Sequence, residues 1–246
     1  MRSEQVRQAL TTPLTNPAFA ASVPRFTDRE YLNVVYRTDY DALRAVVPEP
    51  LVVEEPLVRF EIMRMNEVTS FGPYTEAGQA VPVRLGDEHG EYLHAMYLDN
   101  FPAIASGREL SAYPKVLATP ELHTEHAALV GTLDYGSQRV ATATMGYKHQ
   151  PLEADRAGEQ ITVPTYMLNI VPGNDRTPRV CELVRTEITD ITVKQAWTAP
   201  ARLQLFEHAL APLADLPVRG IVSASHILTD LTLGPAHPVH DYLHER

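Results

Sequence analysis

The pattern of apolar and polar residues along the chain is mostly that of β-strands. Short segments rich in Val, Ile, Leu, Tyr and Thr recur between positions occupied by Gly, Pro, Asn or Asp. Gly136 and Ser137 separate two of these segments and predict a hairpin turn. The segment at 180–193 alternates in the manner of one half-buried strand. Strands are predicted at residues 30–37, 51–53, 57–65, 79–85, 91–98, 127–135, 138–147, 166–171, 180–193 and 221–233.

Helical periodicity is confined to a few stretches. Leucine and phenylalanine recur at spacings of three and four between residues 200 and 213, which predicts a long helix that Thr198 can cap. Two shorter helices are predicted at 3–10 and 39–46. No repeat, low-complexity tract or clear linker divides the chain. We therefore expect residues 1–246 to form a single, mainly antiparallel β domain with a few peripheral helices.

Composition and charge remove several classes of function. Of the 246 residues, 44% are hydrophobic and 21% are charged, as in ordinary globular proteins. The net charge of −10 argues against a nucleic-acid surface, which needs clustered Lys and Arg. No apolar run approaches the ~20 residues that span a bilayer, and residues 1–14 lack the apolar core of a signal peptide. Cys181 is the only cysteine, which fits a reducing compartment, so we expect a cytoplasmic protein without a membrane partner.

Familiar catalytic and metal motifs are missing from the sequence. Histidines gather at His123 and His126 and again in the C-terminal tail, but both groups lie in polar segments and match no zinc pattern such as H-E-x-x-H. No Gly-rich phosphate loop joins a strand to a helix. Ser225 and His226 are not set in a G-x-S-x-G nucleophile elbow. We predict no metal site, nucleotide site or serine hydrolase.

Lys115 stands out because it follows a proline and has mostly apolar neighbours, in the stretch Gly107-Arg-Glu-Leu-Ser-Ala-Tyr-Pro-Lys-Val116. A lysine ammonium is a poor nucleophile because its ordinary pKa is near ~10.4. Burial disfavours the charged form and can turn a lysine into an amine that attacks carbonyl carbon. For a single lysine, the commoner arrangement is a stem that covers apolar surface and a head in water.

Three charged residues near apolar segments could also form a site. On strand alternation, Glu61 shares a face with Arg59 and Met63. Glu76 lies in a loop of small residues that enters a strand, and Arg29 precedes a strand. Taken separately, each is more simply explained as a surface ion pair or a turn charge.

Nine segments together resemble the acetoacetate decarboxylase family, from about Thr12 to the last predicted strand. They are Arg29-Glu-Tyr31, Val35-Tyr-Arg-Thr-Asp39, Val47-Pro-Glu-Pro50, Val58-Arg-Phe-Glu-Ile62, Tyr74-Thr-Glu-Ala-Gly-Gln-Ala80, Tyr97-Leu-Asp-Asn100, Gly107 to Lys115, Ala141-Thr-Ala-Thr-Met-Gly-Tyr147 and Ala209-Leu-Ala-Pro-Leu213.

The resemblance implies a carboxy-lyase that converts acetoacetate to acetone and CO2 through a lysine Schiff base, without a metal or an organic cofactor. Lys115 matches the family's Schiff-base lysine, and Arg29, Glu61 and Glu76 match charged residues of its pocket. The implied fold is a cone or barrel-like β-sheet. The implied assembly is a homo-oligomer, often a dodecamer, and the implied partner is a small β-keto acid.

Val116 departs from the family, which commonly has a second lysine directly after the nucleophile. A lysine pKa falls through a nearby like charge or through desolvation, and Val116 removes the first option at this position. Neighbouring residues of an extended chain also point to opposite faces, so a lysine there need not reach the amine. Activation would then depend on a dry pocket.

The mechanism limits how charge can be arranged around such a lysine. A lysine that is half neutral near pH 6–7 needs a pKa about four below its ordinary value, and a carboxylate beside the amine opposes this. We expect one of Glu61 and Glu76 to be protonated or paired with Arg29, with Glu76 preferred as the partner. At least one of them should be available for proton transfer, and the sequence leaves open which one. Arg29 could also hold the substrate carboxylate. Phe26, Met96 and Tyr113 are the expected apolar lining.

Two other functions stay open on the same residues. A Schiff-base aldolase-dehydratase that acts on oxo acids and aldehydes would share the fold and the lysine. The whole Glu76 segment favours the decarboxylase over this alternative. A non-catalytic β-barrel that binds small ligands would form no lysine adduct.

Overall fold

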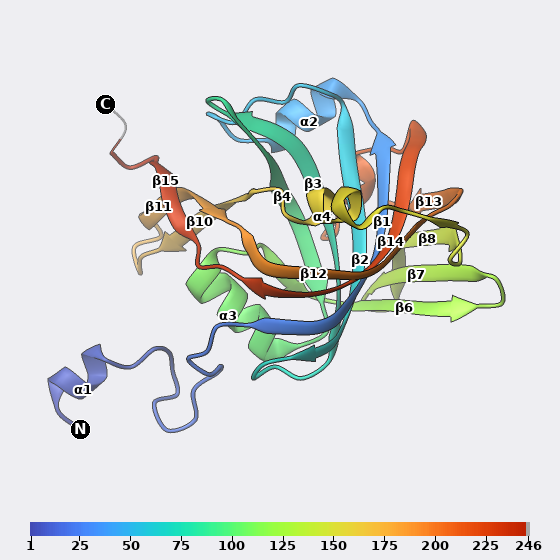
Figure 1. Ribbon diagram of the computed structural model, residues 1–246. Helices are drawn as coiled ribbons and strands as arrows, with labels where there is room; N and C mark the ends of the chain where they lie inside the picture. The colour runs from blue at the N-terminus through green and yellow to red at the C-terminus, as the bar shows by residue number, and fades with distance from the viewer. Residues whose placement is uncertain (245–246) are drawn as a thin grey trace.

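The structure, a computed structural model, describes residues 1–244, and its largest element is an eleven-stranded sheet (Figure 1). Most neighbouring strands are antiparallel, but β4 pairs in parallel with β5 and β10, so the sheet is mixed. The prediction of a mainly β fold is confirmed. In spatial order the strands are β15 (His237–Asp241), β11 (Pro178–Thr186), β10 (Thr165–Pro172), β4 (Glu88–Leu98), β3 (Tyr74–Leu85), β2 (Leu57–Val68), β1 (Arg25–Arg37), β14 (Gly220–Leu233), β12 (Ile188–Thr198) and β9 (Gln150–Pro151), with β5 (Lys115–Leu117) alongside β4.

The two ends of this sheet approach each other. Glu187 alone joins β11 to β12, although these strands lie near opposite ends of the strand order. The backbone N–H of Gly234 donates to the carbonyl oxygen of Glu187 at 3.0 Å. The Thr186 hydroxyl donates to the carbonyl oxygen of Gly234, also at 3.0 Å. The sheet is therefore curled around an interior, as the expected cone or barrel-like shape requires.

The same junction corrects one predicted strand. Residues 180–193 form parts of β11 and β12 and not one strand. The alternation of side chains continues through Glu187, so the pattern gave no sign of the break. The change of hydrogen-bonding partners, from β10 and β15 to β14 and β9, is a property of the whole sheet that local periodicity does not contain.

A four-stranded sheet packs against the outer face of the large one. Leu32, Phe60 and Ile62 of the large sheet meet Leu129 and Leu133 of the small sheet in a buried apolar layer. The predicted hairpin is present, with Tyr135 paired to Gln138 and Gly136 at a φ of 62°. The small sheet has the order β13 (Ala201–Leu205), β8 (Gln138–Gly146), β7 (Ala128–Tyr135) and β6 (Thr119–Glu125).

A second apolar cluster fills the inside of the curled sheet. Met63, Met96 and Met167 belong to it, and Ala157 and Ile161 of α4 enter it from a helix. Figure 1 shows α3 beside the lower part of the sheet, whereas α1 stands apart and buries no residue. The helices are α1 (Ser3–Arg7), α2 (Tyr40–Val46), α3 (Phe101–Ser111), α4 (Ala154–Ile161) and a 3-10 turn, η1 (Leu213–Asp215).

The long helix predicted over residues 200–213 is wrong. Ala201 and Leu203 are buried with exposed residues between them, which is strand periodicity, and Leu203 pairs with Ala143 of β8. The chain then turns into η1, and Leu210 is 70% exposed. Pro212 also removes a helical N–H and clashes with the preceding turn. The strand pairing of residues 201–205 with β8 is therefore favoured over a helix, because the helical spacing of apolar residues fits only part of residues 200–213.

Several further elements differ from the prediction. β5, β6, β9 and β15 were not predicted as strands. α3 and α4 were not predicted either, because the apolar residues of α3 form no clear stripe and the stripe of α4 is short, with Ala157 and Ile161 as its buried residues. Asn100 is the residue of the sequence that could have indicated the start of α3. Its side chain caps the helix by accepting a hydrogen bond from the backbone N–H of Ala103 at 3.0 Å. The strand predicted at 51–53 is reduced to one bridge between Val52 and Arg84.

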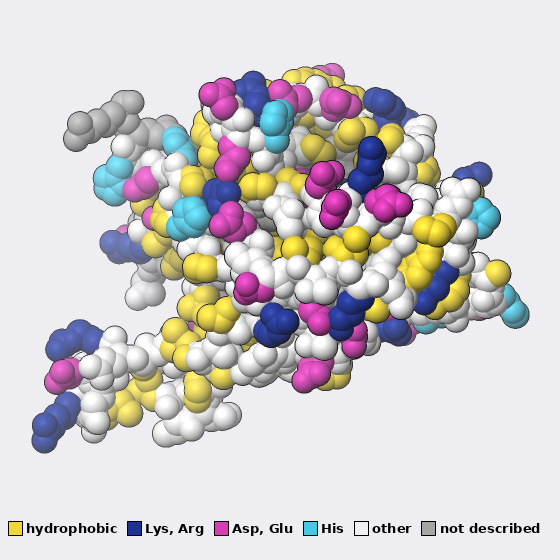
Figure 2. Space-filling model, in the orientation of Figure 1, with side chains coloured by type: hydrophobic (Ala, Val, Ile, Leu, Met, Phe, Trp, Pro, Cys, Tyr) yellow, Lys and Arg dark blue, Asp and Glu magenta, His cyan; other side chains and the backbone are white. Residues whose placement is uncertain are grey.

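Charged side chains of both signs lie on the side of the molecule that is drawn in space-filling form (Figure 2). Figure 2 shows acidic and basic side chains interspersed there, unlike the basic stripe that a nucleic acid needs. Within residues 1–244, no helix combines the length and the apolar character that crossing a membrane takes.

Candidate active site

One row of paired residues crosses the inner face of the large sheet and carries three of the predicted site residues. Glu61 of β2 pairs with Gly78 of β3, Gly78 with Met96 of β4, and Met96 with Lys115 of β5. Paired residues project from the same face, so Glu61 and Lys115 point into the same interior. Their Cα atoms are three strand spacings apart, about 14 Å, which leaves room for a small molecule between the two head groups.

Lys115 begins β5 directly after Pro114 and is 8% exposed. Its Nζ lies 3.3 Å from Glu76 Oε2 and 5.2 Å from the ring centre of Tyr113. The lysine stem packs against Gly107 of α3, where a Cβ atom would fall 2.6 Å from Lys115 Cδ. Helix α3 therefore forms the wall behind the amine, and glycine is the residue that leaves space for it.

Arg29 and Glu76 form the second charged contact of the interior. Arg29 Nη2 lies 3.7 Å from Glu76 Oε1, and the guanidinium stacks on the rings of Phe26 and Tyr31 at 4.9 and 4.8 Å. Burial alone would lower the pKa of Arg29, but Tyr31 and Glu76 raise it above its usual value, so the guanidinium stays charged. Its Nε has no hydrogen-bond partner among residues 1–244. Glu76 thus contacts Arg29 and Lys115 at once.

Glu61 contacts a different arginine. Arg59 Nη1 donates to Glu61 Oε2, and the same guanidinium binds Glu91 through Nε and Nη2. Burial raises the pKa of Glu61, and this exceeds the opposing effect of Arg59. Gly78 makes space beside this carboxyl group, because a Cβ there would lie 3.4 Å from Glu61 Oε1. Glu61 is therefore the interior carboxyl group with a raised affinity for a proton.

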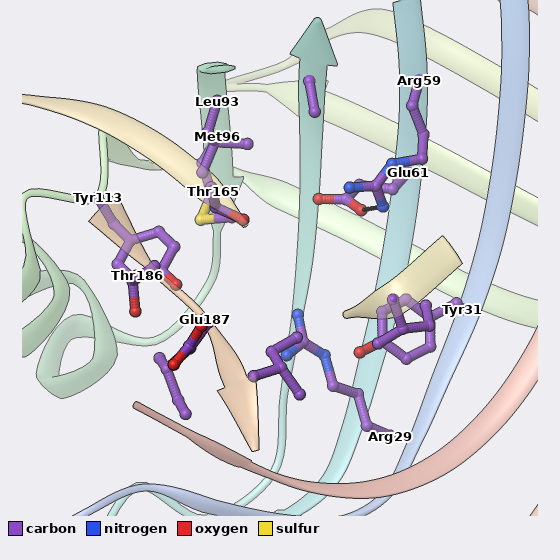
Figure 3. A pocket seen from close by; sticks show the side chains of 14 residues that line it. Arg29, Tyr31, Arg59, Glu61, Leu93, Met96, Tyr113, Thr165, Thr186 and Glu187 are labelled. Carbon is purple, nitrogen blue, oxygen red and sulfur yellow. Dashed lines mark hydrogen bonds and ion pairs between the residues drawn. The ribbon is translucent and has the colours of Figure 1, made fainter. Parts of the chain in front are cut away.

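Two adjoining cavities separate the amine from most of the charged groups. The smaller one, about 50 Å³, is the pocket of Figure 3, where Arg29, Arg59 and Glu61 face the space from β1 and β2. The larger one, about 360 Å³, contains Lys115 and has mostly apolar walls from α3, β1 and residues 233–236. Tyr113 and Leu233 line both cavities. A bound molecule could place a polar end in one and an apolar end in the other.

The structure brings all seven predicted site residues to this interior. Phe26 lines the larger cavity, Met96 the smaller and Tyr113 both, while Lys115, Glu76, Arg29 and Glu61 supply the charged groups. Burial raises the pKa of Tyr31 to about 12 and the pKa values of Tyr74 and Tyr113 further, so the phenols near the amine are neutral.

Sequence reasoning missed three contributors to the site. Glu91 opens a predicted strand without any local sign that it binds Arg59, and Tyr74 precedes one. Gly107 was quoted only as part of a motif, although a glycine in a helix that continues for several residues signals close packing. Within residues 1–244, no three His, Cys, Asp or Glu side chains are placed to hold a metal ion.

Val116 lies on the opposite face of β5. It is 37% exposed and borders a crevice with His94, Pro114 and Pro212, away from both cavities. The Val116→Lys variant is therefore expected to keep the wild-type dependence of activity on pH, because the added ammonium points away from Lys115. The check is a pH–rate profile of both proteins, and a displaced acid limb in the variant would contradict this geometry.

Three comparisons identify proteins that this chain resembles. The family model described as acetoacetate decarboxylase matches residues 11–243. The acetoacetate decarboxylase of Streptomyces nogalater is 63% identical over 243 residues, covering 99% of this chain and 100% of that protein. The acetoacetate decarboxylase of Clostridium acetobutylicum is 60% identical with the same coverage. A solved acetoacetate decarboxylase structure superposes with a TM-score of 0.98 at 59% identity, covering 99% of this chain and 100% of that one.

Proposed function

The chain belongs to the acetoacetate decarboxylase family, and on that premise we propose that it converts acetoacetate to acetone and CO2 through a Schiff base on Lys115. The activity is that of a carboxy-lyase. One observation carries the assignment of the nucleophile: Lys115 is buried with its amine in a largely apolar cavity, in register with Glu61 and 3.3 Å from Glu76.

The proposed reaction uses the protonated imine formed on Lys115 as an electron sink. The neutral amine of Lys115 adds to the ketone carbon of acetoacetate, and loss of water leaves a protonated imine. The carbon–carbon bond to the carboxylate then breaks, CO2 leaves, and the electron pair moves into an enamine. A proton adds to the terminal carbon, and water hydrolyses the imine to release acetone and the amine.

Glu76 contacts both Arg29 and Lys115, and this arrangement bears on the charge of the lysine. A lone carboxylate beside Lys115 would favour an ammonium. Arg29 lies 3.7 Å from the same carboxylate and already supplies it with a positive partner. The carboxylate therefore does not need Lys115 as its counter-ion, and the amine can be neutral without leaving a buried charge unpaired.

Arg29 is the proposed partner of the substrate carboxylate. Its guanidinium faces the smaller cavity, and its Nε is buried without an acceptor. A carboxylate in that cavity would be near Arg29, while the methyl group of acetoacetate would face the apolar walls around Lys115. As CO2 forms, the negative charge of the substrate carboxylate moves toward the imine and away from Arg29. Arg29 therefore contributes more to substrate binding than to the rate of the chemical step.

Glu61 is the proposed proton donor to the enamine. Its pKa is raised by burial, so it can carry a proton at a pH where an exposed glutamate would not. Glu76 contacts Arg29 and Lys115, and its proposed role is to hold these two side chains in place. This divides the roles of the two glutamates, which the sequence left open.

The direct test is to incubate the protein with acetoacetate and borohydride and to map the reduced adduct by mass spectrometry. We expect one adduct, on Lys115, together with release of acetone and CO2. An active enzyme with an unmodified Lys115 would rule out the Schiff-base assignment. Condensation of pyruvate with an aldehyde, without CO2 release from acetoacetate, would favour the aldolase-dehydratase instead.

The Arg29→Gln variant is expected to bind acetoacetate more weakly, with KM raised about 10- to 100-fold, because a hydrogen bond to a charged group is worth about 1.5–3 kcal/mol. We expect kcat to change less than KM. Steady-state kinetics on both proteins measure this. Arg64→Gln is the matched control, since Arg64 pairs with Glu30 on the other face of the sheet. A fall in kcat with KM unchanged would contradict a binding role.

Assembly and location stay predictions. A homo-oligomer, possibly a dodecamer, is supported by α1, none of whose residues is buried and which has the exposed side chains of Val6 and Leu10 in or near it. Sedimentation velocity would give the mass of the particle. The cytoplasmic location is proposed from the sequence alone, in part from its single cysteine.

A further inference from the structure

Arg59 lies between two glutamates, and only one of them faces a cavity. Glu61 lines the smaller cavity, whereas Glu91 lines neither of the two. Arg59 reaches Glu91 through two nitrogens and Glu61 through one. Figure 3 shows Arg59 and Glu61 side by side above the pocket. Glu91 is 8% exposed, so the bidentate pair is held inside the protein.

The charges buried around the two cavities sum to zero in an active protonation state only if Glu91 is counted. Glu187 also lines the smaller cavity, but it is exposed and pairs with Arg185. Arg29 is balanced by Glu76 and Arg59 by Glu91, so the net charge depends on Lys115 and Glu61, which contact these two pairs. A neutral amine and a protonated Glu61 then give no net charge. Without Glu91 the same state would carry one excess positive charge, and ionisation of Glu61 would remove it.

We propose that Glu91 is a positioning residue, which takes up the charge of Arg59 and so allows Glu61 to carry the proton that the enamine receives. This rests on the proposed function, in which Glu61 is the donor. Arg59 links the two glutamates. Its hydrogen bond keeps Glu61 directed into the smaller cavity, and its pairing with Glu91 keeps it from acting as a full counter-ion of Glu61. Neither residue needs to touch the substrate.

The groups that face Glu61 come from four strands and agree with this balance. Burial is the largest cause that raises its pKa, Arg59 of β2 lowers it, and Glu91 of β4 raises it. Arg29 of β1 lowers it and Glu76 of β3 raises it. Glu91 is therefore the acidic neighbour that raises the pKa of Glu61 most, and both glutamates bind Arg59.

The Glu91→Gln variant tests the proposal through the pH profile of kcat, which reports groups of the enzyme with substrate bound and includes the proton transfer that follows loss of CO2. The donor must hold its proton, so activity is lost as the pH rises through the pKa of Glu61. Removing Glu91 leaves Arg59 free to favour ionised Glu61. The alkaline limb should therefore move to lower pH by about one pH unit or more, the usual effect of an opposite charge at this range.

Two further variants separate this role from a structural one. Glu88→Gln lies on the same strand and removes an exposed pair with Arg185, and its profile should match the wild type. Glu91→Asp keeps the charge and should return the limb toward its wild-type position. A uniform loss of kcat at every pH, or an unmoved limb in Glu91→Gln, would overturn the proposal. Borohydride trapping on Lys115 should persist in Glu91→Gln, and its absence in the wild type would count against the Schiff base instead.

Discussion

Lys115→Ala is expected to lower kcat for acetoacetate by at least about 10⁴-fold, the scale seen when a covalent catalyst loses its nucleophile. No other amine can take its place inside the protein. The sequence contains two further lysines, Lys148 and Lys194, and both are exposed. The variant should also lose the borohydride adduct. Measurements of CO2 release and of intact mass after trapping check both outcomes.

Two matched variants make this result specific. Lys115→Arg keeps a positive charge near Glu76 but cannot form an imine, so it should be as inactive as the alanine variant. Lys148→Ala removes a surface lysine that lies 4.4 Å from the Trp197 ring centre and should be fully active. Substantial turnover by Lys115→Arg would show that the residue acts through its charge and would refute covalent catalysis.

Gly107→Ala is expected to lower kcat about 10²-fold while the protein stays folded. The new methyl group would lie 2.6 Å from Lys115 Cδ and 3.2 Å from Nζ, so the flexible lysine must move. A displacement of about 1 Å at a reacting group can cost about 10²-fold in rate. Alanine is also the better helix former by about 1 kcal/mol, so the melting temperature should hold or rise.

Gly158→Ala in α4 is the control for this prediction. Its methyl group would meet Val193 Cγ2 at 3.8 Å, an ordinary contact, so both stability and activity should be kept. Thermal unfolding and steady-state kinetics on the two variants give the comparison. Full activity in Gly107→Ala would mean that the lysine has more freedom than its packing indicates.

Local patterns predicted what depends on neighbours in sequence. Alternation located most of the strands and put Arg59, Glu61 and Met63 on one face of β2, which is the face turned to the interior. It also placed Val116 opposite Lys115, as the crevice beside β5 shows. These features follow from the two-residue period of a strand, so a single segment contains the information.

What the sequence did not predict depends on partners far along the chain. Residues 201–205 pair with β8, and this pairing replaced the helix that their leucines suggested. Glu91 meets Arg59 only because β2, β3 and β4 lie side by side. The family resemblance supplied the grouping of Arg29, Glu61, Glu76 and Lys115, which no spacing in the sequence indicated.

β1 pairs with β14, which lies near the other end of the chain, so this part of the sheet cannot form until most of the chain is present. The side chains of Asn33 and Ser225, which lie on this pair, form a hydrogen bond across 192 residues of sequence. Closing so long a loop is entropically costly, and folds dominated by distant pairings form slowly. During synthesis Lys115 emerges long before β14 does. A nascent chain would carry this amine in open water as an ordinary, unreactive ammonium, so the chemistry can begin only when the last long strand has been added.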